Sequence, residues 1–131
     1  MQYIIYKRFK TKAICGDVNI PAMTECEERN GVLFHNGKPL CYVASENAHQ
    51  FFARNDDGNG LVRGELIQNI KRRLEKRDNS YQKRWDKVWE DSLCQKYKRK
   101  EFDDFWLWCH EFYNAPIEDL QYIHNLVKGV A

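Results

Sequence analysis

The stretch SENAHQFFARNDDGNGLVRGELIQNIKRRLEKR, residues 45–77, decides how the chain is organised. It holds a short helical pattern, then an Asp-Asp-Gly-Asn-Gly loop, then a helix with an apolar stripe and a basic face. Short alternating segments with turn signals precede this stretch, and long helical patterns follow it. The sequence therefore predicts an α+β fold in which residues 45–77 join a β part to a helical part.

The residues before this stretch predict a small antiparallel sheet. Two strands are expected at 3–9 and 13–20, and Gly16 is a candidate bulge. Asn-Gly pairs then separate three further strands, which are expected at 24–29, 32–35 and 39–43. Asn-Gly suits a type I′ hairpin turn because both of its central residues need a positive φ. Five short strands cannot bury a wide flat sheet, so we expect them to curl into an SH3-like barrel.

The remaining residues predict helices. Ser45 is expected to be the N-cap of a short helix that continues to Phe51 and Phe52 and plugs the barrel. The loop 54–60 leads into a helix at 61–76, whose apolar residues recur at helical spacing. Three further helices are expected: one from Tyr81 that Asp91-Ser92 interrupts before it resumes from Leu93 to Tyr97, one at 102–113 and one opened by Pro116. We thus expect a single domain, 1–131, with a β part at 1–53, a loop at 54–60 and a layer of about four helices at 61–131.

Length and composition narrow the class of protein. A chain of 131 residues with 43% hydrophobic residues can bury one core. No run of about 18 apolar residues is present, and the N-terminal MQYIIYKRFK lacks the apolar region of a signal peptide. We therefore expect no membrane span and a cytoplasmic location. Five cysteines at irregular spacing favour reduced thiols that pack as small hydrophobic side chains.

Charge is distributed unevenly along the chain. Residues 63–100 hold 13 Lys and Arg against 6 Asp and Glu, whereas residues 101–131 hold 1 against 6. The positive segment can form a basic surface for a protein partner or for nucleic acid, or it can pair internally with the acidic C-terminal segment. If it faces solvent, the partner-binding residues are predicted to be Lys71, Arg72, Arg73, Lys76, Arg77, Lys96, Lys98, Arg99 and Lys100.

The central loop offers an alternative site. Asn55, Asp57 and Asn59, followed by Gly60, match the opening of a calcium-binding loop, but the twelfth position holds Leu66 in place of the bidentate Glu. Glycines before a helix could instead cradle a phosphate, although their spacing matches neither nucleotide-binding pattern. The nucleotide-binding alternative rests on Arg54, Asn55, Asp57 and Arg63.

No full catalytic or metal motif is found in the sequence. Pairs such as Cys41 with His49 lack the spacing of a nucleophile and its base. A metal site could draw on Cys94, Cys109, His110 and His124, but their spacing matches no known metal motif. We therefore predict no catalytic residue, no metal and no cofactor, and we expect a binding protein in place of an enzyme.

Three stretches carry a resemblance to known proteins: YIIYKRFKTKAICGDVNIP at 3–21, NGKPLCYVASENAHQFFARNDDGNG at 36–60 and FYNAPIEDL at 112–120. On these stretches the chain resembles a group of small accessory proteins encoded in phages and prophages of Gram-positive bacteria. The resemblance covers most of the chain, and it assigns chemistry to none of its residues.

The resemblance implies a biological context, which is the cytoplasm of an infected host. Small phage proteins of this kind act by binding, so the chain is expected to inhibit a host defence complex such as a CRISPR nuclease by direct contact through the basic helices. Its partner is then a host protein or ribonucleoprotein complex. The alternatives are an anti-defence sponge that sequesters a signalling nucleotide and a nucleic-acid-binding accessory protein. A mimic of DNA is disfavoured because the net charge is +2.

Overall fold

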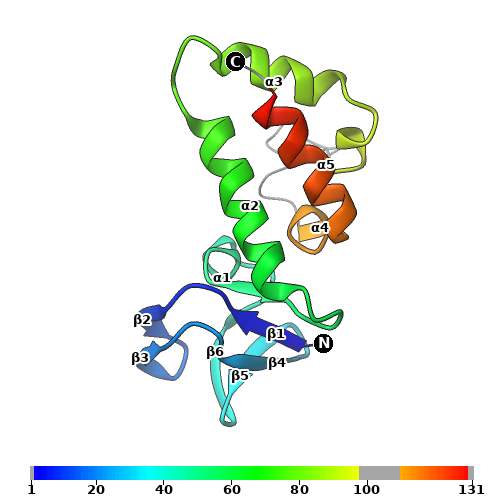
Figure 1. Cartoon of the computed structure of the whole chain (residues 1–131). Helices are drawn as coiled ribbons and strands as arrows, with labels where there is room; N and C mark the ends of the chain where they lie inside the picture. The colour runs from blue at the N-terminus through cyan, green and yellow to red at the C-terminus, as the bar shows by residue number, and fades with distance from the viewer. Residues whose placement is uncertain (1, 98–109, 130–131) are drawn as a thin grey trace. The chain divides into compact units, whose positions relative to one another are not determined.

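The computed structural model describes residues 2–97 and 110–129 and has an α+β fold, with strands in the N-terminal part and helices after them (Figure 1). The chain divides into two compact units, Met1–Glu65 and Leu66–Ala131. Buried hydrophobic residues form one cluster in each unit. The single domain expected from the sequence stays a prediction.

Five strands of the first unit form an antiparallel sheet in the order β6-β5-β4-β1-β7. Their bounds are Gln2–Ile5 for β1, Glu25–Arg29 for β4, Val32–His35 for β5, Lys38–Tyr42 for β6 and Phe52–Arg54 for β7. Both Asn-Gly pairs have positive φ, with 51° and 82° at Asn30 and Gly31, and 52° and 74° at Asn36 and Gly37. The predicted meander and its two turns are therefore confirmed.

The first two predicted strands are wrong in their bounds. The chain leaves β1 after Ile5, and a separate hairpin follows, with β2 at Phe9–Ala13 and β3 at Gly16–Ile20. Gly16 is no bulge within a strand, because it begins β3 directly after the two-residue turn. Its φ of 116° is open to glycine and strained for other residues.

The sheet is open, so the closed SH3-like barrel is not confirmed. β6 and β7 are its edges. The hairpin lies against the β6 edge, where the backbone N–H groups of Ile14 and Cys15 donate to the carbonyls of Leu40 and Pro39, at 2.9 and 3.1 Å. The core of this unit comprises Tyr3, Ile5, Phe9, Ala13, Ile20, Cys26, Leu33, Leu40, Ala48 and Phe52.

The helix predicted after Ser45 is present but shorter than expected. Helix α1 spans Glu46–His49, and Ser45 is its N-cap, since its hydroxyl accepts a hydrogen bond from the Ala48 N–H at 3.2 Å. Phe52 lies in β7 instead, paired with Ile5 of β1. The exposed edge of β1 offers backbone hydrogen bonds that a longer helix would leave unmade, and Phe52 gains an edge-to-face contact with Phe9.

Helix α2 spans Gly60–Glu75, and the second unit adds α3 at Tyr81–Glu90, the short 3-10 helix η1 at Cys94–Tyr97, α4 at His110–Tyr113 and α5 at Ile117–Lys128. The predicted helix 61–76 and the break at Asp91-Ser92 are confirmed. Most of the predicted helix 102–113 lies outside the described residues. Pro116 is the N-cap of α5, one position earlier than the first-turn place predicted for it.

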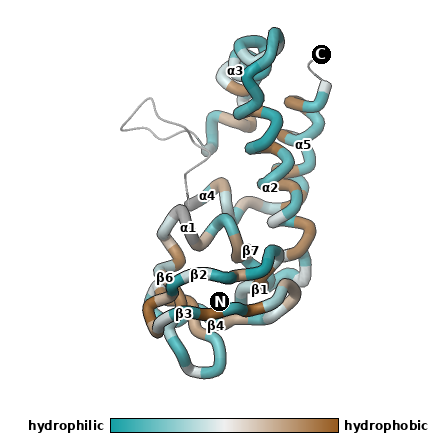
Figure 2. Tube along the Cα trace, turned by 90° about the vertical axis from the view of Figure 1, so that its left-hand side faces the viewer, coloured by the Kyte–Doolittle hydropathy of each residue, from teal (hydrophilic) through white to brown (hydrophobic). Residues whose placement is uncertain are grey.

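Hydrophobic residues recur along α2 and α5 between hydrophilic ones (Figure 2). In the core of the second unit, Trp85 of α3 donates its indole N–H to the Leu74 carbonyl of α2 at 2.9 Å. This bond satisfies a carbonyl in the last turn of α2, where no helical partner remains. No helix among residues 2–97 and 110–129 has the length and apolar character to cross a membrane.

Candidate functional site

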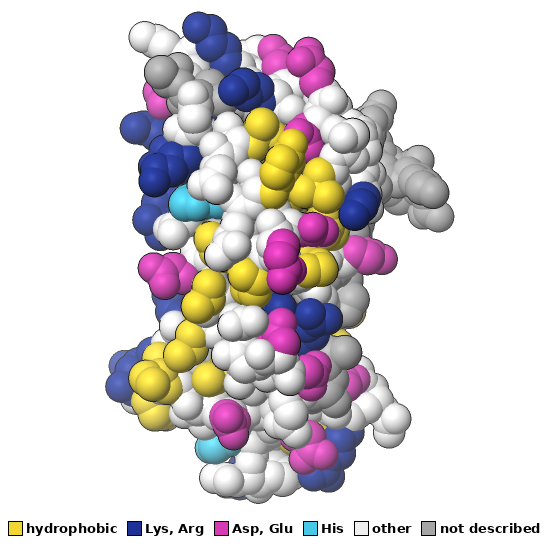
Figure 3. Space-filling view, turned by 45° about the vertical axis from the view of Figure 1, so that its right-hand side comes forward, with side chains coloured by type: hydrophobic (Ala, Val, Ile, Leu, Met, Phe, Trp, Pro, Cys, Tyr) yellow, Lys and Arg dark blue, Asp and Glu magenta, His cyan; other side chains and the backbone are white. Residues whose placement is uncertain are grey.

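Four cations lie exposed at the C-terminal end of α2 and in the turn after it: Arg72, Arg73, Lys76 and Arg77. We call this set the arginine face. At about 100° per residue, Arg72 and Arg73 lie about 100° apart around α2, away from its buried side, and Lys76 follows directly after the helix. Figure 3 shows Lys and Arg side chains gathered along one edge of the helical part.

The turn that carries the arginine face is held by a buried arginine. Arg84 of α3 is 5% exposed, and its guanidinium forms an ion pair with Asp78 at 2.9 Å and donates to the Lys76 carbonyl. The Arg77 guanidinium lies 4.3 Å from the centre of the Tyr81 ring, which is a cation–π contact. Lys76 is only loosely paired, since its Nζ lies 3.8 Å from Asp78. Arg84 therefore fixes the backbone, and the cations around it stay at the surface.

The arginine face is not neutralised by the described acidic residues of the C-terminal segment. Within residues 2–97 and 110–129, Arg72 and Arg73 form no ion pair, and Asp119 instead accepts a hydrogen bond from Tyr97. Burial, followed by the charges of Arg73 and Lys128, lowers the pKa of His124. Arg73 of α2 and Lys128 of α5 therefore both act on His124. The acidic residues at 101–104, the other candidates for internal pairing, lie outside the described part.

Of the other predicted partner-binding residues, Lys71 is buried and does not join this surface. Lys71 is 8% exposed, and its Nζ lies 3.3 Å from the Tyr113 hydroxyl. It lies across the helix from Arg73, because two residues turn the helix by about 200°. Lys96 is exposed in η1. Lys98, Arg99 and Lys100 lie outside the described residues.

The central loop is organised around Arg63, which has no exposed surface. Its guanidinium donates to both carboxylate oxygens of Asp57, at 2.6 and 3.2 Å, and to the Arg54 carbonyl at 2.6 Å. The side-chain oxygen of Asn55 accepts from the Gly60 N–H at 2.8 Å. Arg54 is a weaker neighbour, with its Nη2 3.9 Å from Asp57. Arg54, Asp57 and Arg63 are thus brought together by bonds to one another, whereas Asn55 bonds to Gly60.

This arrangement limits what the loop can bind. The hydrogen bonds from Arg63 hold the pKa of Asp57 well below its usual range. A phosphate would have to displace that carboxylate from Arg63, and a cation would have to displace Arg63 itself. Among the residues that the structure describes, no group of three His, Cys, Asp or Glu side chains is placed to hold a metal ion.

One cationic cluster was missed by the sequence analysis. Lys7, Arg8, Lys10 and Lys12, which lie on the β2–β3 hairpin and just before it, are exposed. The net charge of residues 1–62 does not reveal them, because 7 Asp and Glu balance 7 Lys and Arg there. The alternation of Lys10 and Lys12 with Phe9, Thr11 and Ala13 was the available signal, since alternate residues of a strand share a face.

Comparisons with protein-family models, with curated proteins and with solved structures give no match to this chain.

Proposed function

We propose that the chain is a non-enzymatic binding protein whose arginine face contacts an acidic surface on a host protein or ribonucleoprotein complex. In the phage context that the sequence resemblance implies, this contact inhibits a host defence complex. The observation that carries the proposal is the group of three arginines and a lysine, exposed within one region, of which Lys76 alone lies near an acidic side chain of the described residues, at 3.8 Å from Asp78.

The residue types favour a protein partner for this face. Arginine is enriched in protein interfaces and in their energetic hot spots, and its planar guanidinium can bind a carboxylate through two hydrogen bonds. The contact of Arg77 with Tyr81 already restricts one of these side chains. Less conformational entropy is then lost when a partner binds.

A pull-down tests the proposal. The tagged full-length chain is used to capture partners from a Gram-positive host lysate, with and without nuclease treatment. The test variant combines Arg72→Glu, Arg73→Glu and Arg77→Glu, and the control combines Lys83→Glu with Lys87→Glu, two exposed lysines of α3. We expect a stoichiometric host protein that survives nuclease, is retained by the control and is lost by the arginine variant.

Two results contradict the proposal. If the arginine variant retains the partner as well as the wild type does, the contact lies elsewhere. If nuclease removes every partner, the face binds nucleic acid, which is the accessory-protein alternative. Circular dichroism of each variant confirms that a lost partner does not reflect a lost fold.

A further inference from the structure

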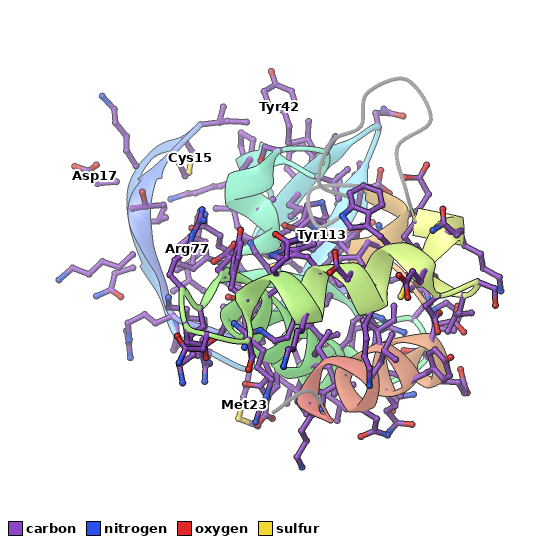
Figure 4. All side chains as sticks on the ribbon, turned by 90° about the horizontal axis from the view of Figure 1, so that it is seen from above. Cys15, Asp17, Met23, Tyr42, Arg77 and Tyr113 are labelled. Carbon is purple, nitrogen blue, oxygen red and sulfur yellow. The ribbon has the colours of Figure 1, made fainter. Side chains whose placement is uncertain are left out.

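The β2–β3 hairpin presents a second cationic surface, in the first unit. Lys10 and Lys12 lie on its exposed face, while Phe9 and Ala13 on the opposite face are buried. Across the hairpin Lys10 pairs with Asn19, and Lys12 pairs with Asp17. In Figure 4, Asp17 points outward from the hairpin, away from the five-stranded sheet. This outward face borders an open hollow of about 450 Å³.

Two further cations extend this surface at the start of β2. Arg8 donates to the Asn19 side-chain oxygen at 2.8 Å, and the Lys7 ammonium lies 5.7 Å from the centre of the Phe51 ring. We call Lys7, Arg8, Lys10 and Lys12 the hairpin cations. None of them forms an ion pair with an acidic side chain in the described part of the chain.

The arginines of the first unit that lie after the hairpin each have an acidic neighbour. Arg29 pairs with Glu27 at 3.0 Å, and Arg63 pairs with Asp57 at 2.6 Å. The exposed acidic residues lie mainly on β4 and in the central loop, whereas the hairpin has Asp17 alone. The unmatched positive charge of this unit is therefore concentrated on the hairpin and the residues that lead into it.

We propose that the hairpin cations bind the phosphate backbone of a nucleic acid. Lysine is depleted from protein interfaces, which need apolar and aromatic anchors, whereas Lys and Arg neutralise phosphates directly. Phe9, the one aromatic residue of the two strands, is 1% exposed, so the strands offer no ring on which a base could stack. The contact is therefore to the backbone and is independent of base sequence. The hairpin belongs to the first unit and the arginine face to the second, and this inference does not depend on the function proposed for the arginine face.

Fluorescence anisotropy tests the inference. The full-length chain is titrated into two labelled 20-bp DNA duplexes of unrelated sequence, at several salt concentrations. The test variant is Lys10→Gln with Lys12→Gln, and the control is Lys83→Gln with Lys87→Gln, which removes the same charge from exposed lysines of the second unit. A third variant, Lys10→Arg with Lys12→Arg, preserves the charge.

We expect the wild type to bind both duplexes equally and the test variant to bind each about tenfold more weakly at low salt. Because each phosphate contact contributes about 0.9 to the slope of log K against log salt, losing two contacts makes that slope shallower by about 1.8. The control and the charge-preserving variant should keep the wild-type affinity and slope. Absence of binding by the wild type overturns the inference, as does an unchanged affinity in the test variant or an equal loss in the control.

Discussion

Arg63 places a full positive charge in the interior of the first unit, where an unpaired charge is costly. Asp57 compensates for that charge with both of its oxygens, and the Arg54 carbonyl accepts a further bond. The Asp57 side chain remains 38% exposed, so the pair bridges interior and solvent. The geometry makes Asp57 the residue on which the shape of the central loop depends.

We predict that Asp57→Asn lowers the free energy of unfolding by about 2 kcal/mol. The amide offers one acceptor oxygen and no charge, so buried Arg63 loses its counter-ion. The cost is below the 3–5 kcal/mol of a fully buried pair because Asp57 is partly solvated. Urea denaturation measures the loss. Asp17→Asn, at an exposed hairpin position, is the control and should change stability by less than about 0.5 kcal/mol. Equal effects of the two substitutions contradict the prediction.

The same pair predicts a dependence of stability on pH. The pKa of Asp57 is lower in the folded chain than in the unfolded chain. The pair's contribution is therefore complete above the usual Asp pKa of about 4, and it is lost progressively as the pH falls below that value. The stability difference between wild type and Asp57→Asn should narrow between pH 7 and pH 2.5. Urea midpoints across this range test the claim, and a constant difference contradicts it.

Sequence reasoning identified these loop residues and not their roles. An Asp-Asp-Gly-Asn-Gly loop before a helix is typical of a ligand site. The sequence therefore points to a site formed by Arg54, Asn55, Asp57 and Arg63. Their pairing depends on which way the first turn of α2 faces, and side-chain periodicity does not fix that direction when the neighbouring sheet is unknown. The apolar stripe of α2 can be predicted because its hydrophobic residues recur at helical spacing in the sequence. The Arg63–Asp57 pair is a single contact, so no periodic pattern in the sequence indicates it.

At the scale of elements, Gly64 shows how the first turns of α2 fit the first unit. A Cβ atom at this position would lie 2.4 Å from the ring of Tyr6, and the Tyr6 hydroxyl is itself held by a bond to the His49 carbonyl at 2.6 Å. The ring can therefore move only by breaking that bond. Glycine is retained in the helix despite its poor helix propensity because the Tyr6 ring occupies the space of a side chain.

We predict that Gly64→Ala destabilises the protein by about 1–3 kcal/mol. In an open helix the same change would stabilise it by about 1 kcal/mol, so the sign of the effect reports the packing against Tyr6. Thermal denaturation provides the measurement, and Glu65→Ala at the adjacent exposed position is the control. A rise in melting temperature for Gly64→Ala would show that the ring yields without cost.

The elements differed in how far the sequence predicted them. The sequence predicts the meander because the Asn-Gly pairs at 30–31 and 36–37 favour the positive φ values of a hairpin turn. The sequence does not predict the β2–β3 hairpin, because its turn, Ile14-Cys15, has no Asn-Gly pair. It does not predict β7 either, because Phe52 suits either a helix or a strand. β7 is decided by pairing with β1, some 50 residues earlier in the chain, which a local pattern cannot show.

At the scale of the whole molecule, net charge conceals two sets of exposed cations, one in each unit. The excess of Lys and Arg over residues 63–100 points to the arginine face. The hairpin cations produce no such excess, because the acidic residues of β4 and the central loop cancel their charge in the net charge of the first half of the chain. Three arginines with a nearby tyrosine suit a protein partner, and a lysine-rich strand face without an exposed aromatic suits phosphates. Whether the cations are mainly arginine or mainly lysine therefore distinguishes the partners proposed for the two surfaces more clearly than the number of charges does.

The organisation into two units leads to a last prediction, which concerns cooperativity. The four tryptophans, at positions 85, 89, 106 and 108, all follow Glu65 in the sequence, and Trp85 and Trp89 lie in α3, so tryptophan fluorescence follows the unfolding of the second unit. Helix α2 runs from Gly60 to Glu75 and crosses the boundary between the units. Unfolding of one unit would therefore unwind part of α2, which also contributes residues to the other unit. We therefore expect a single transition, as the single domain predicted from the sequence requires.

Leu33→Ala tests this expectation in the core of the first unit, where Leu33 has no exposed surface. The substitution should cost about 2–5 kcal/mol, and the urea midpoint measured by tryptophan fluorescence should fall together with the midpoint measured by far-ultraviolet circular dichroism. Met23→Ala, at a position that is 70% exposed in the same unit, should leave both midpoints unchanged. If Leu33→Ala lowers the circular dichroism midpoint and leaves the fluorescence midpoint in place, the units unfold separately. The chain would then be two domains joined by a helix, because a loss of stability in one unit would not reach the other.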